Sequence, residues 1–363
     1  MNPNDFRSDL LSLASRRFLA GLCAAALGVF LPAGALHAQG AAEAMDSGNR
    51  VDAETKTTIK AALKFLAQKQ HLDGSWATVE SKSGHPVAMT GYCLIAFMDA
   101  GNLPDQGEYA KNVAAGEQFL LDSIQPDGMF RDVNASQYMY NHGIATVALA
   151  ELYGESHAPT LRPKLQKLIE VILKAQAPSG GWRYTPQPHD ADISVTVLQA
   201  VALRAAQEAG FAVPQTAIDN AVAYVDSCYS EGEGGFCYQP GKGAGFARTA
   251  AAIYSLQVLG KYDDPRMKPA SSYIMAHTKG GGGQWGAYGN FYAAPAQYMM
   301  GGDTWRTWYS QMKQNLNASV KKEGDLAYWE DSGSGKDLGP VYFTAVYVHV
   351  LSMPFHFVPL YQR

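Results

Sequence analysis

Two kinds of helical segment alternate along most of the chain. The first kind carries apolar residues on one face, as in Ile59, Leu63 and Leu66, which lie three or four residues apart. The second kind is apolar on nearly all sides, as in residues 89–97, and is typical of a helix packed against several neighbours. A glycine such as Gly101 follows the second kind, as expected just beyond a helix end. The pattern predicts pairs of helices, one amphipathic and one buried.

A glycine-containing turn closed by an aromatic residue lies between the two helices of each pair. This turn occurs six times, and its aromatic residues are 44 to 54 positions apart. They are Trp76, Phe130, Trp182, Phe236, Trp285 and Trp329. Such a period indicates one supersecondary unit copied along the chain. We therefore predict an all-α fold, an (α/α)6 toroid (barrel) of six helical hairpins, with structural aromatic residues closing the turns and no strong β-strand.

The repeat also predicts the domain limits. Residues 52–363 are expected to form a single α/α toroid domain with six repeats, ending in a C-terminal strap over 354–363. Residues 39–51 are expected to be a linker. A toroid has a central cavity, so we expect the site there, at the end where the inner helices begin.

Residues 1–38 have the pattern of an export signal peptide. Arg16 and Arg17 precede an apolar run over 18–31, and small residues follow where a signal peptidase would cleave. The same two arginines partly match a twin-arginine signal, so the general and the twin-arginine routes both stay open. We expect an exported protein, periplasmic or extracellular, with no transmembrane segment in the mature chain.

Composition restricts the partners without naming one. The net charge is −4 and 17% of residues are charged, so no basic surface predicts nucleic acid as a partner. Export permits disulfides, and Cys228 and Cys237 either pair across the fourth turn or stay as buried thiols. No Cys or Cys/His spacing predicts a structural zinc site. An apolar small molecule or a cell-envelope component is the expected partner.

A few polar residues near the starts of the inner helices are candidate site residues. Counting twelve residues back from the terminating glycine gives Met89, His142 and Arg248 in the first, second and fourth repeats. In the third repeat, aligning a threonine within each helix places Asp192 opposite His142. In a closed ring, we expect His142, Asp192 and Arg248 to point inward together at one level.

The order of outer helix, Gly-x-aromatic turn and inner helix resembles the prenyltransferase and squalene-oxidase repeat. Residues 181–200 and 234–259 carry the resemblance best, and the architecture extends over essentially the whole chain after the signal. The resemblance implies the toroid shared by protein prenyltransferase β subunits and by squalene and oxidosqualene cyclases. In that family the working residues lie at the starts of the inner helices, facing the cavity.

The zinc site of the prenyltransferases is not matched. Asp192 corresponds to a zinc ligand of that family, but Ser194 stands where its cysteine would be and Arg248 where its histidine would be. A serine hydroxyl is a poor zinc ligand, and arginine does not ligate metals. We therefore predict no metal and no cofactor, which argues against zinc-dependent protein prenylation. His142 resembles the histidine that contacts the diphosphate in those enzymes.

The acidic motif of the cyclases is present in a reduced form. Those enzymes protonate an alkene with the central Asp of Asp-x-Asp-Asp-Thr, and residues 190–194 read Asp-Ala-Asp-Ile-Ser. The resemblance implies catalytic roles for Asp192, His142 and Asp190, with Arg248 positioning the ligand. Alternatives stay open: both aspartates could be helix caps, His142 could be structural, and Arg248 could pair with Asp192 across the ring.

Aromatic residues near the inner-helix starts are candidate ligand contacts. Tyr140, Tyr292 and Tyr342, with Met89, are the residues proposed to bind a ligand, because aromatic faces line the cavity in the cyclases. The same spacing is also compatible with ordinary core packing.

Three functions stay open. The first is binding or transformation of an apolar, isoprenoid-like ligand in the central cavity by acid chemistry. The second is a non-catalytic toroid that binds a protein or cell-envelope partner. The third is a carbohydrate-active (α/α)6 enzyme, which requires paired carboxylates.

Overall fold

The computed structural model describes residues 51–78, 85–131, 133–278, 285–330 and 338–355. They all belong to one compact unit, Gly48–Arg363. The predicted export signal lies outside the described residues, as do the linker up to residue 50 and the strap beyond residue 355.

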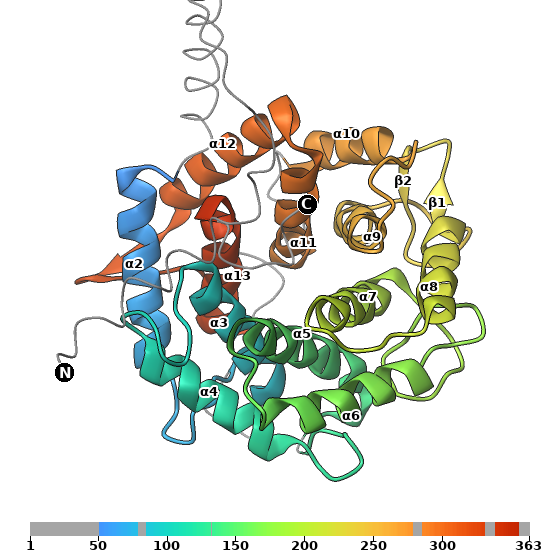
Figure 1. The fold of residues 1–363 in the computed structure, drawn as a ribbon. Coiled ribbons are helices and arrows are strands. Elements are labelled where there is room, and N and C mark those ends of the chain that lie inside the picture. Colours follow the sequence, from blue (N-terminus) through green and yellow to red (C-terminus); the bar gives the residue numbers. More distant parts are fainter. Residues whose placement is uncertain (1–50, 79–84, 132, 279–284, 331–337, 356–363) are drawn as a thin grey trace, which may run out of the picture. The chain divides into compact units, whose positions relative to one another are not determined.

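Within the described residues, twelve α-helices alternate between an outer and an inner position around a ring (Figure 1). The outer helices are α2 (Ala53–Gln68), α4 (Ala110–Ser123), α6 (Leu161–Lys174), α8 (Gln215–Ser227), α10 (Met267–Thr278) and α12 (Gly302–Ser319). The inner helices are α3 (Pro86–Asp99), α5 (Tyr138–Ser156), α7 (Ile193–Glu208), α9 (Phe246–Val258), α11 (Gly286–Met300) and α13 (Gly339–Ser352). Among the described residues, Ala135–Gln137 and Met353–Phe355 form short 3-10 turns.

The ring closes through its inner helices. Each inner helix contacts the inner helices before and after it, and α13 contacts α3. The outer helix α2 also packs against α13, so the first repeat is joined to the last at both layers. The predicted all-α toroid is therefore confirmed.

The two helix types bury different faces, as the hydrophobic pattern predicts. The outer helix α6 buries Leu161, Leu165, Leu168 and Ile172, which share one face at helical spacing. The inner helix α7 is buried along almost its whole circumference because it contacts both layers.

At three of the turn tryptophans, two hydrogen bonds join the helices of a pair. At Trp182, the backbone N–H donates to Thr196 Oγ1 of α7 at 3.0 Å, and the indole Nε1–H donates to the Ile172 carbonyl of α6 at 2.7 Å. The same bonds recur at Trp76, with Thr90 and Leu66, and at Trp329, with Thr344 and Leu316. The turn therefore fixes the angle between outer and inner helix in the same way in these repeats.

The turn glycine is required by its conformation and by a close contact. Gly180 has a φ of 98°, and a Cβ atom there would lie 2.1 Å from the Asn220 carbonyl oxygen of α8. The Gln176 side chain bridges the same junction by donating to the carbonyls of Gly180 and Ala217, both at 2.8 Å. The third turn thus also binds the following outer helix.

One turn aromatic was assigned wrongly from the sequence. Trp285 is 63% exposed and precedes α11 instead of packing between two helices. In the second repeat, the Phe130 N–H donates to the Tyr138 hydroxyl at 2.6 Å, where other repeats use a threonine. The repeat is therefore regular in helix order and less regular in its turn contacts.

Short strands also depart from the prediction. β1 (Tyr229–Ser230) pairs with β2 (Gly235–Phe236), and β3 (Lys321–Glu323) pairs with β4 (Leu326–Tyr328), both antiparallel. Each pair is a turn hairpin of two or three residues per strand, too short to give an alternating sequence signal.

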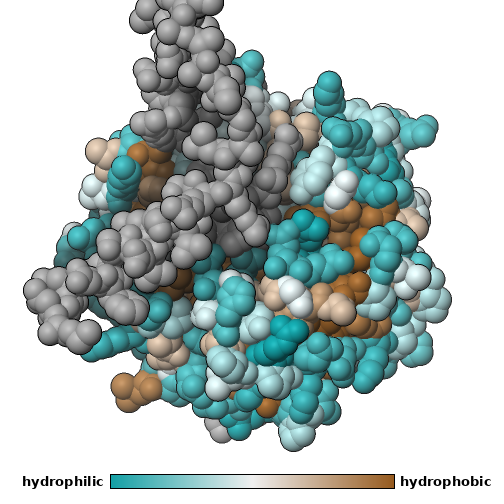
Figure 2. Space-filling view, in the orientation of Figure 1, coloured by the Kyte–Doolittle hydropathy of each residue, from teal (hydrophilic) through white to brown (hydrophobic). Residues whose placement is uncertain are grey.

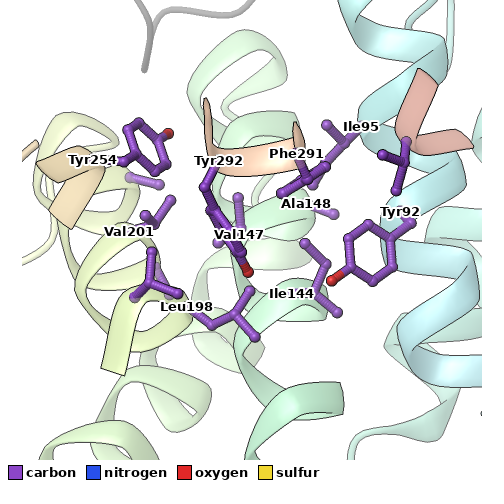
Figure 3. Close-up of a cluster of buried hydrophobic side chains, with 14 of the residues drawn as sticks. Tyr92, Ile95, Ile144, Val147, Ala148, Leu198, Val201, Tyr254, Phe291 and Tyr292 are labelled. Carbon is purple, nitrogen blue, oxygen red and sulfur yellow. The ribbon is translucent and has the colours of Figure 1, made fainter. Parts of the chain in front are cut away.

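Apolar side chains fill the middle of the ring. Five inner helices contribute the buried cluster in Figure 3: Tyr92, Ile95, Ile144, Val147, Ala148, Leu198, Val201, Tyr254, Phe291 and Tyr292. An open channel at this depth would expose these residues, so the toroid is packed across its centre here. Among the described helices, none has the length and apolar character needed to cross a membrane.

Candidate functional site

Asp192 is the N-cap of α7 and is completely buried. Its Oδ1 accepts hydrogen bonds from the Val195 N–H at 3.1 Å and the Ser194 hydroxyl at 2.5 Å. Its Oδ2 lies 3.0 Å from Nε of Arg183, an ion pair without standard hydrogen-bond geometry. The Tyr238 hydroxyl also interacts with this carboxylate. Asp192 is therefore a cap, as one alternative expected, and also the centre of a polar cluster.

Burial is the largest influence on the acidity of Asp192. It raises the pKa of the carboxyl above its ordinary value, because the charged form loses contact with water. The bonds from Ser194 and Val195, the Tyr238 hydroxyl and the charge of Arg183 oppose this effect without cancelling it. A carboxyl in this environment can hold and donate a proton at a higher pH than a surface aspartate.

The arginine that pairs with Asp192 is Arg183, and not Arg248 as the sequence predicts. Its guanidinium pairs with Asp192 and with the exposed Asp190, and it lies over the rings of Tyr184 at 4.8 Å and Tyr238 at 5.7 Å. Such stacking holds the planar cation in one orientation.

Arg248 lies elsewhere, so its predicted convergence with Asp192 is wrong. Its Nη1 donates to the Gly243 carbonyl at 3.1 Å, and its charge acts on Glu233 of the fourth turn. No ion pair joins it to Asp192 among the described residues. We therefore remove Arg248 from the candidate site.

His142 has a structural role in the second repeat. It is completely buried, its Nε2 lies 3.0 Å from the Leu168 carbonyl of α6, and its Nδ1 lies 3.3 Å from the Tyr138 hydroxyl. A carbonyl only accepts, so Nε2 carries the proton and Nδ1 accepts from Tyr138, which itself accepts from the Phe130 N–H. His142 thus completes the turn contact of the second repeat, facing the outer layer.

This role predicts a pH dependence of stability. Burial lowers the pKa of His142 from 6.5 to about 4, so the folded protein keeps the ring neutral while the unfolded chain binds a proton below pH 6.5. Stability should therefore fall as the pH decreases from 6.5 to 4, by roughly 3 kcal/mol in total. Urea unfolding of the wild type and His142→Gln at pH 7 and pH 5 measures it. The variant should lose this dependence, whereas His157→Gln, at an exposed histidine, should keep it.

Hydroxyl groups surround Ser194 beside Asp192. Because Ser194 donates to Asp192, the Tyr140 hydroxyl of α5 donates to Ser194 Oγ, at 2.5 Å. The Tyr288 hydroxyl of α11 donates to the Ser194 carbonyl at 2.7 Å, and the hydroxyls of Tyr184 and Tyr238 bond to each other. These contacts bring three inner helices and two turns together around one carboxylate.

The tyrosine cluster continues towards the opposite side of the ring. Tyr288 packs edge-on against Tyr292 at 5.0 Å, and Tyr92 packs edge-on against Tyr342 at 5.2 Å. Tyr92 and Tyr292 turn their hydroxyl ends towards the same part of the ring centre (Figure 3). Burial raises the pKa of all four phenols, so they stay neutral. Tyr140 thus lies in the polar cluster, and Tyr292 and Tyr342 lie in the aromatic core beside it, with Met89 buried in α3.

Sequence reasoning missed Arg183, Ser194, Tyr184 and Tyr238 as functional candidates. Each lies in the third or fourth turn or at the first turn of α7, next to the motif that was recognised. Tyr184 and Tyr238 are 54 residues apart, the repeat period, and this spacing was a usable signal for a contact between neighbouring turns.

The sequence also raised two questions about the cysteines and about side chains that could hold a metal. Cys93, Cys228 and Cys237 are buried free thiols, and the Cys237 N–H donates to the Cys228 carbonyl at 2.8 Å. Among the described residues, no group of three histidine, cysteine, aspartate or glutamate side chains could hold a metal.

The face shown in Figure 2 is mostly hydrophilic, with hydrophobic residues gathered over the part of the ring that α7, α8 and α9 form.

Comparison with known families agrees with the fold. The sequence model of the prenyltransferase α-α toroid domain matches residues 108–287. That segment contains Asp192, Arg183 and the tyrosines of the third and fourth turns. A search of curated protein sequences found no match.

Solved structures share the toroid at low sequence identity. An inactive variant of the α-1,6-mannanase of Salegentibacter sp. HEL1_6, in complex with α-1,6-mannotriose, aligns with a TM-score of 0.63 at 10% identity and covers 84% of this chain and 99% of its own. A type II terpene cyclase from Scytonema, in complex with geranylgeranyl dihydroxybenzoate, aligns at 0.57 and 13%, covering 84% and 98%. Protein geranylgeranyltransferase-I of Candida albicans, complexed with GGPP, aligns at 0.54 and 13%, covering 81% and 90%. These likenesses show the fold alone.

Proposed function

We propose that this toroid, whose residues 108–287 belong to the prenyltransferase α-α toroid domain family, binds an apolar, isoprenoid-like small molecule where its inner helices begin. Asp192 is the proton donor. The observation that carries the proposal is a fully buried carboxyl, with its pKa raised by burial, at the edge of a cluster of tyrosines. We also propose that residues 52–363 act as a single domain and that the protein works outside the cytoplasm, after export through residues 1–38.

The surroundings of Asp192 suit an apolar ligand with a small polar group. The rings of Tyr140, Tyr288 and Tyr292 offer aromatic faces for a hydrocarbon chain. The hydroxyls of Tyr140 and Tyr288 donate to Ser194, which leaves their oxygens to accept a hydrogen bond from a polar group of the ligand. Tyr140 and Tyr288 are partly exposed, whereas Tyr292 and Asp192 are buried. A ligand would therefore contact Tyr140 and Tyr288 first.

The carbohydrate-active alternative has less support from the carboxylates. Asp190 and Asp192 bind the same guanidinium, so they do not face each other across a gap that a sugar could enter. Glycosidases place two carboxyl groups on opposite sides of the scissile bond. The non-catalytic alternative does have one supporting observation, the packed centre of the ring in Figure 3.

The test uses the full chain with geranylgeraniol and squalene as probes, presented in detergent micelles. Binding is measured by the change in protein fluorescence, and conversion by gas chromatography with mass spectrometry. Asp192→Asn keeps an N-cap side chain, so the start of α7 should be preserved. We expect the wild type to bind and convert at least one probe and the variant to bind it with about a hundredfold less conversion, as for loss of a general acid.

Asp303→Asn is the matched control, because Asp303 lies on the outer helix α12 with its side chain exposed. It should behave as the wild type. Equal conversion by Asp192→Asn would exclude the acid role. Absence of binding to both probes would exclude the apolar ligand and favour the partner-binding alternative.

A further inference from the structure

Arg183 links a buried carboxylate to an exposed one. Its Nε lies 3.0 Å from Oδ2 of Asp192, and its Nη1 pairs with Oδ2 of Asp190. The Asp192 side chain is 0% exposed, the Asp190 side chain is 59% exposed, and Arg183 is 27% exposed. The Arg183 guanidinium is therefore shared between the buried carboxylate of Asp192 and the solvent-exposed carboxylate of Asp190.

The neighbouring turn holds Asp190 in this position. Gln239 Nε2 lies 3.3 Å from each carboxylate oxygen of Asp190 and donates to the Ala191 carbonyl at 2.8 Å. The Ala191 N–H donates to Asp190 Oδ1 at 2.8 Å. Tyr184 and Tyr238 bracket the guanidinium. Three hydrogen bonds thus hold the exposed Asp190 carboxylate beside Arg183, which is more than a surface ion pair requires.

We propose that Asp190 is a positioning residue that draws Arg183 partly away from Asp192 and so lets the buried Asp192 carboxyl retain a proton. If Asp192 had Arg183 to itself, the fork of the guanidinium could bind its carboxylate through two donors, the arrangement that most favours ionisation. In the structure the closest contact from Arg183 to Asp192 is made by Nε, and that contact lacks standard hydrogen-bond geometry. The negative charge of Asp190 acts in the same direction, by opposing a second charge nearby.

The other titratable groups that act on Asp192 do not change the sign of this effect. They are the hydroxyls of Tyr140, Tyr224, Tyr238 and Tyr288 and the thiol of Cys228. Burial raises the pKa of each of them, so they stay neutral across the range in which a carboxyl titrates. The charges that differ between variants are therefore those of Arg183 and Asp190.

The experiment is a carboxyl-carbon NMR titration of the full chain labelled with [13Cγ]aspartate, in which Asp192→Asn identifies the Asp192 signal. In Asp190→Asn, the Asp192 midpoint should move to lower pH, because Arg183 then serves Asp192 alone. In Asp190→Glu, the midpoint should stay near that of the wild type. In Arg183→Gln, it should move to higher pH. Asp303→Asn, which removes an exposed carboxylate paired with Arg306, should have no effect.

The double variant Arg183→Gln/Asp190→Asn separates competition for Arg183 from simple charge repulsion. If Asp190 acts through Arg183, removing its charge should shift the midpoint much less in the Arg183→Gln background than in the wild type. An equal shift in both backgrounds would overturn the proposal, as would an unchanged midpoint in Asp190→Asn. Asp190 is exposed, so its single variants should fold even if Arg183→Gln does not, and an unchanged midpoint in Asp190→Asn overturns the proposal in that case too.

This inference deepens the proposed function, because a retained proton matters most if Asp192 is an acid. The titration needs no ligand, however, so the two can fail separately. A midpoint that responds as expected, in a protein that converts neither probe, would support the positioning role and reject the catalytic one. If conversion is found, Asp190→Asn should lower it more at pH 7 than at pH 5, and Asp190→Glu should restore it.

Discussion

Replacing Trp182 by alanine is expected to destabilise the protein by about 3–5 kcal/mol, the usual effect of removing a buried tryptophan. The indole is fully buried between α6 and α7, and its N–H satisfies the Ile172 carbonyl near the end of α6. The substitution leaves a cavity between the two layers and a buried carbonyl without its donor. Urea unfolding followed by circular dichroism measures the loss.

Trp285→Ala is the matched control for this prediction. It removes the same side chain from a turn in the fifth repeat, where the indole is 63% exposed. The expected change is within about 0.5 kcal/mol, as for most surface substitutions. Trp182→Phe should fall between the two, because it keeps most of the ring and loses the indole N–H. Similar losses for Trp182→Ala and Trp285→Ala would show that the turn tryptophans do not join the layers.

The fold could be predicted because its signal is local and repeated. Each repeat combines an amphipathic helix, a glycine that the turn requires, and a helix apolar on all sides. At Gly180 the reason is clear, since the left-handed backbone and the approach of α8 both exclude a side chain. Such constraints act within about fifty residues, so they are visible in sequence without knowledge of distant contacts. The exposure of Trp285 was not visible, because it depends on how that one turn departs from the others.

The predicted convergence of His142, Asp192 and Arg248 failed for a geometric reason. Counting back from Gly154 assumed that this glycine ends the inner helix, but it lies inside α5, which continues to Ser156. The threonine used to align the third repeat, Thr146, bonds to the His142 carbonyl and does not receive the turn N–H. The threonine that accepts the turn N–H is Thr196 in the third repeat and Thr249 in the fourth. Asp192 lies four residues before Thr196, whereas Arg248 lies one residue before Thr249. A shift of three residues on a helix changes both level and direction.

Asp192 lies at the centre of the polar cluster because two constraints coincide there. Its carboxylate caps α7, which the sequence can indicate, and it meets Arg183 and Tyr238 from two turns, which the sequence cannot. The partner of a buried charge is set by the closure of the ring and the packing of neighbouring turns. For this reason the charge partner of Asp192 is Arg183, nine positions before it, and not the predicted Arg248, 56 positions after it.

A second buried polar group gives the other large expected effect. Pro295 lies inside α11 and has no N–H to donate to the Phe291 carbonyl, one turn earlier. His349 of α13 supplies the missing donor, with Nε2 at 3.1 Å from that carbonyl, and its Nδ1 lies 2.7 Å from Oδ2 of Asp99 in α3. His349 and Asp99 are both buried. One side chain thus joins three inner helices where the last repeat meets the first.

His349→Ala is therefore expected to destabilise the protein by about 3–5 kcal/mol at pH 7, because it leaves the Asp99 carboxyl buried without its partner. Asp99→Asn should cost much less, since an amide can still hydrogen-bond to the imidazole. Urea unfolding of the two single variants and the double variant measures the coupling between the residues. A loss in Asp99→Asn as large as that in His349→Ala would contradict this assignment.

The pH dependence of the His349→Ala deficit separates lost charge pairing from lost packing. Burial raises the pKa of Asp99 above its ordinary value of 3.8, and His349 opposes that rise. A raised carboxyl pKa contributes stability that is fully present below the unfolded value and is lost as pH rises through the folded value. Removing His349 raises the folded pKa further, so the deficit should be small at pH 4 and grow towards pH 7. An equal deficit at both pH values would mean that His349 acts through packing and its bond to Phe291 alone.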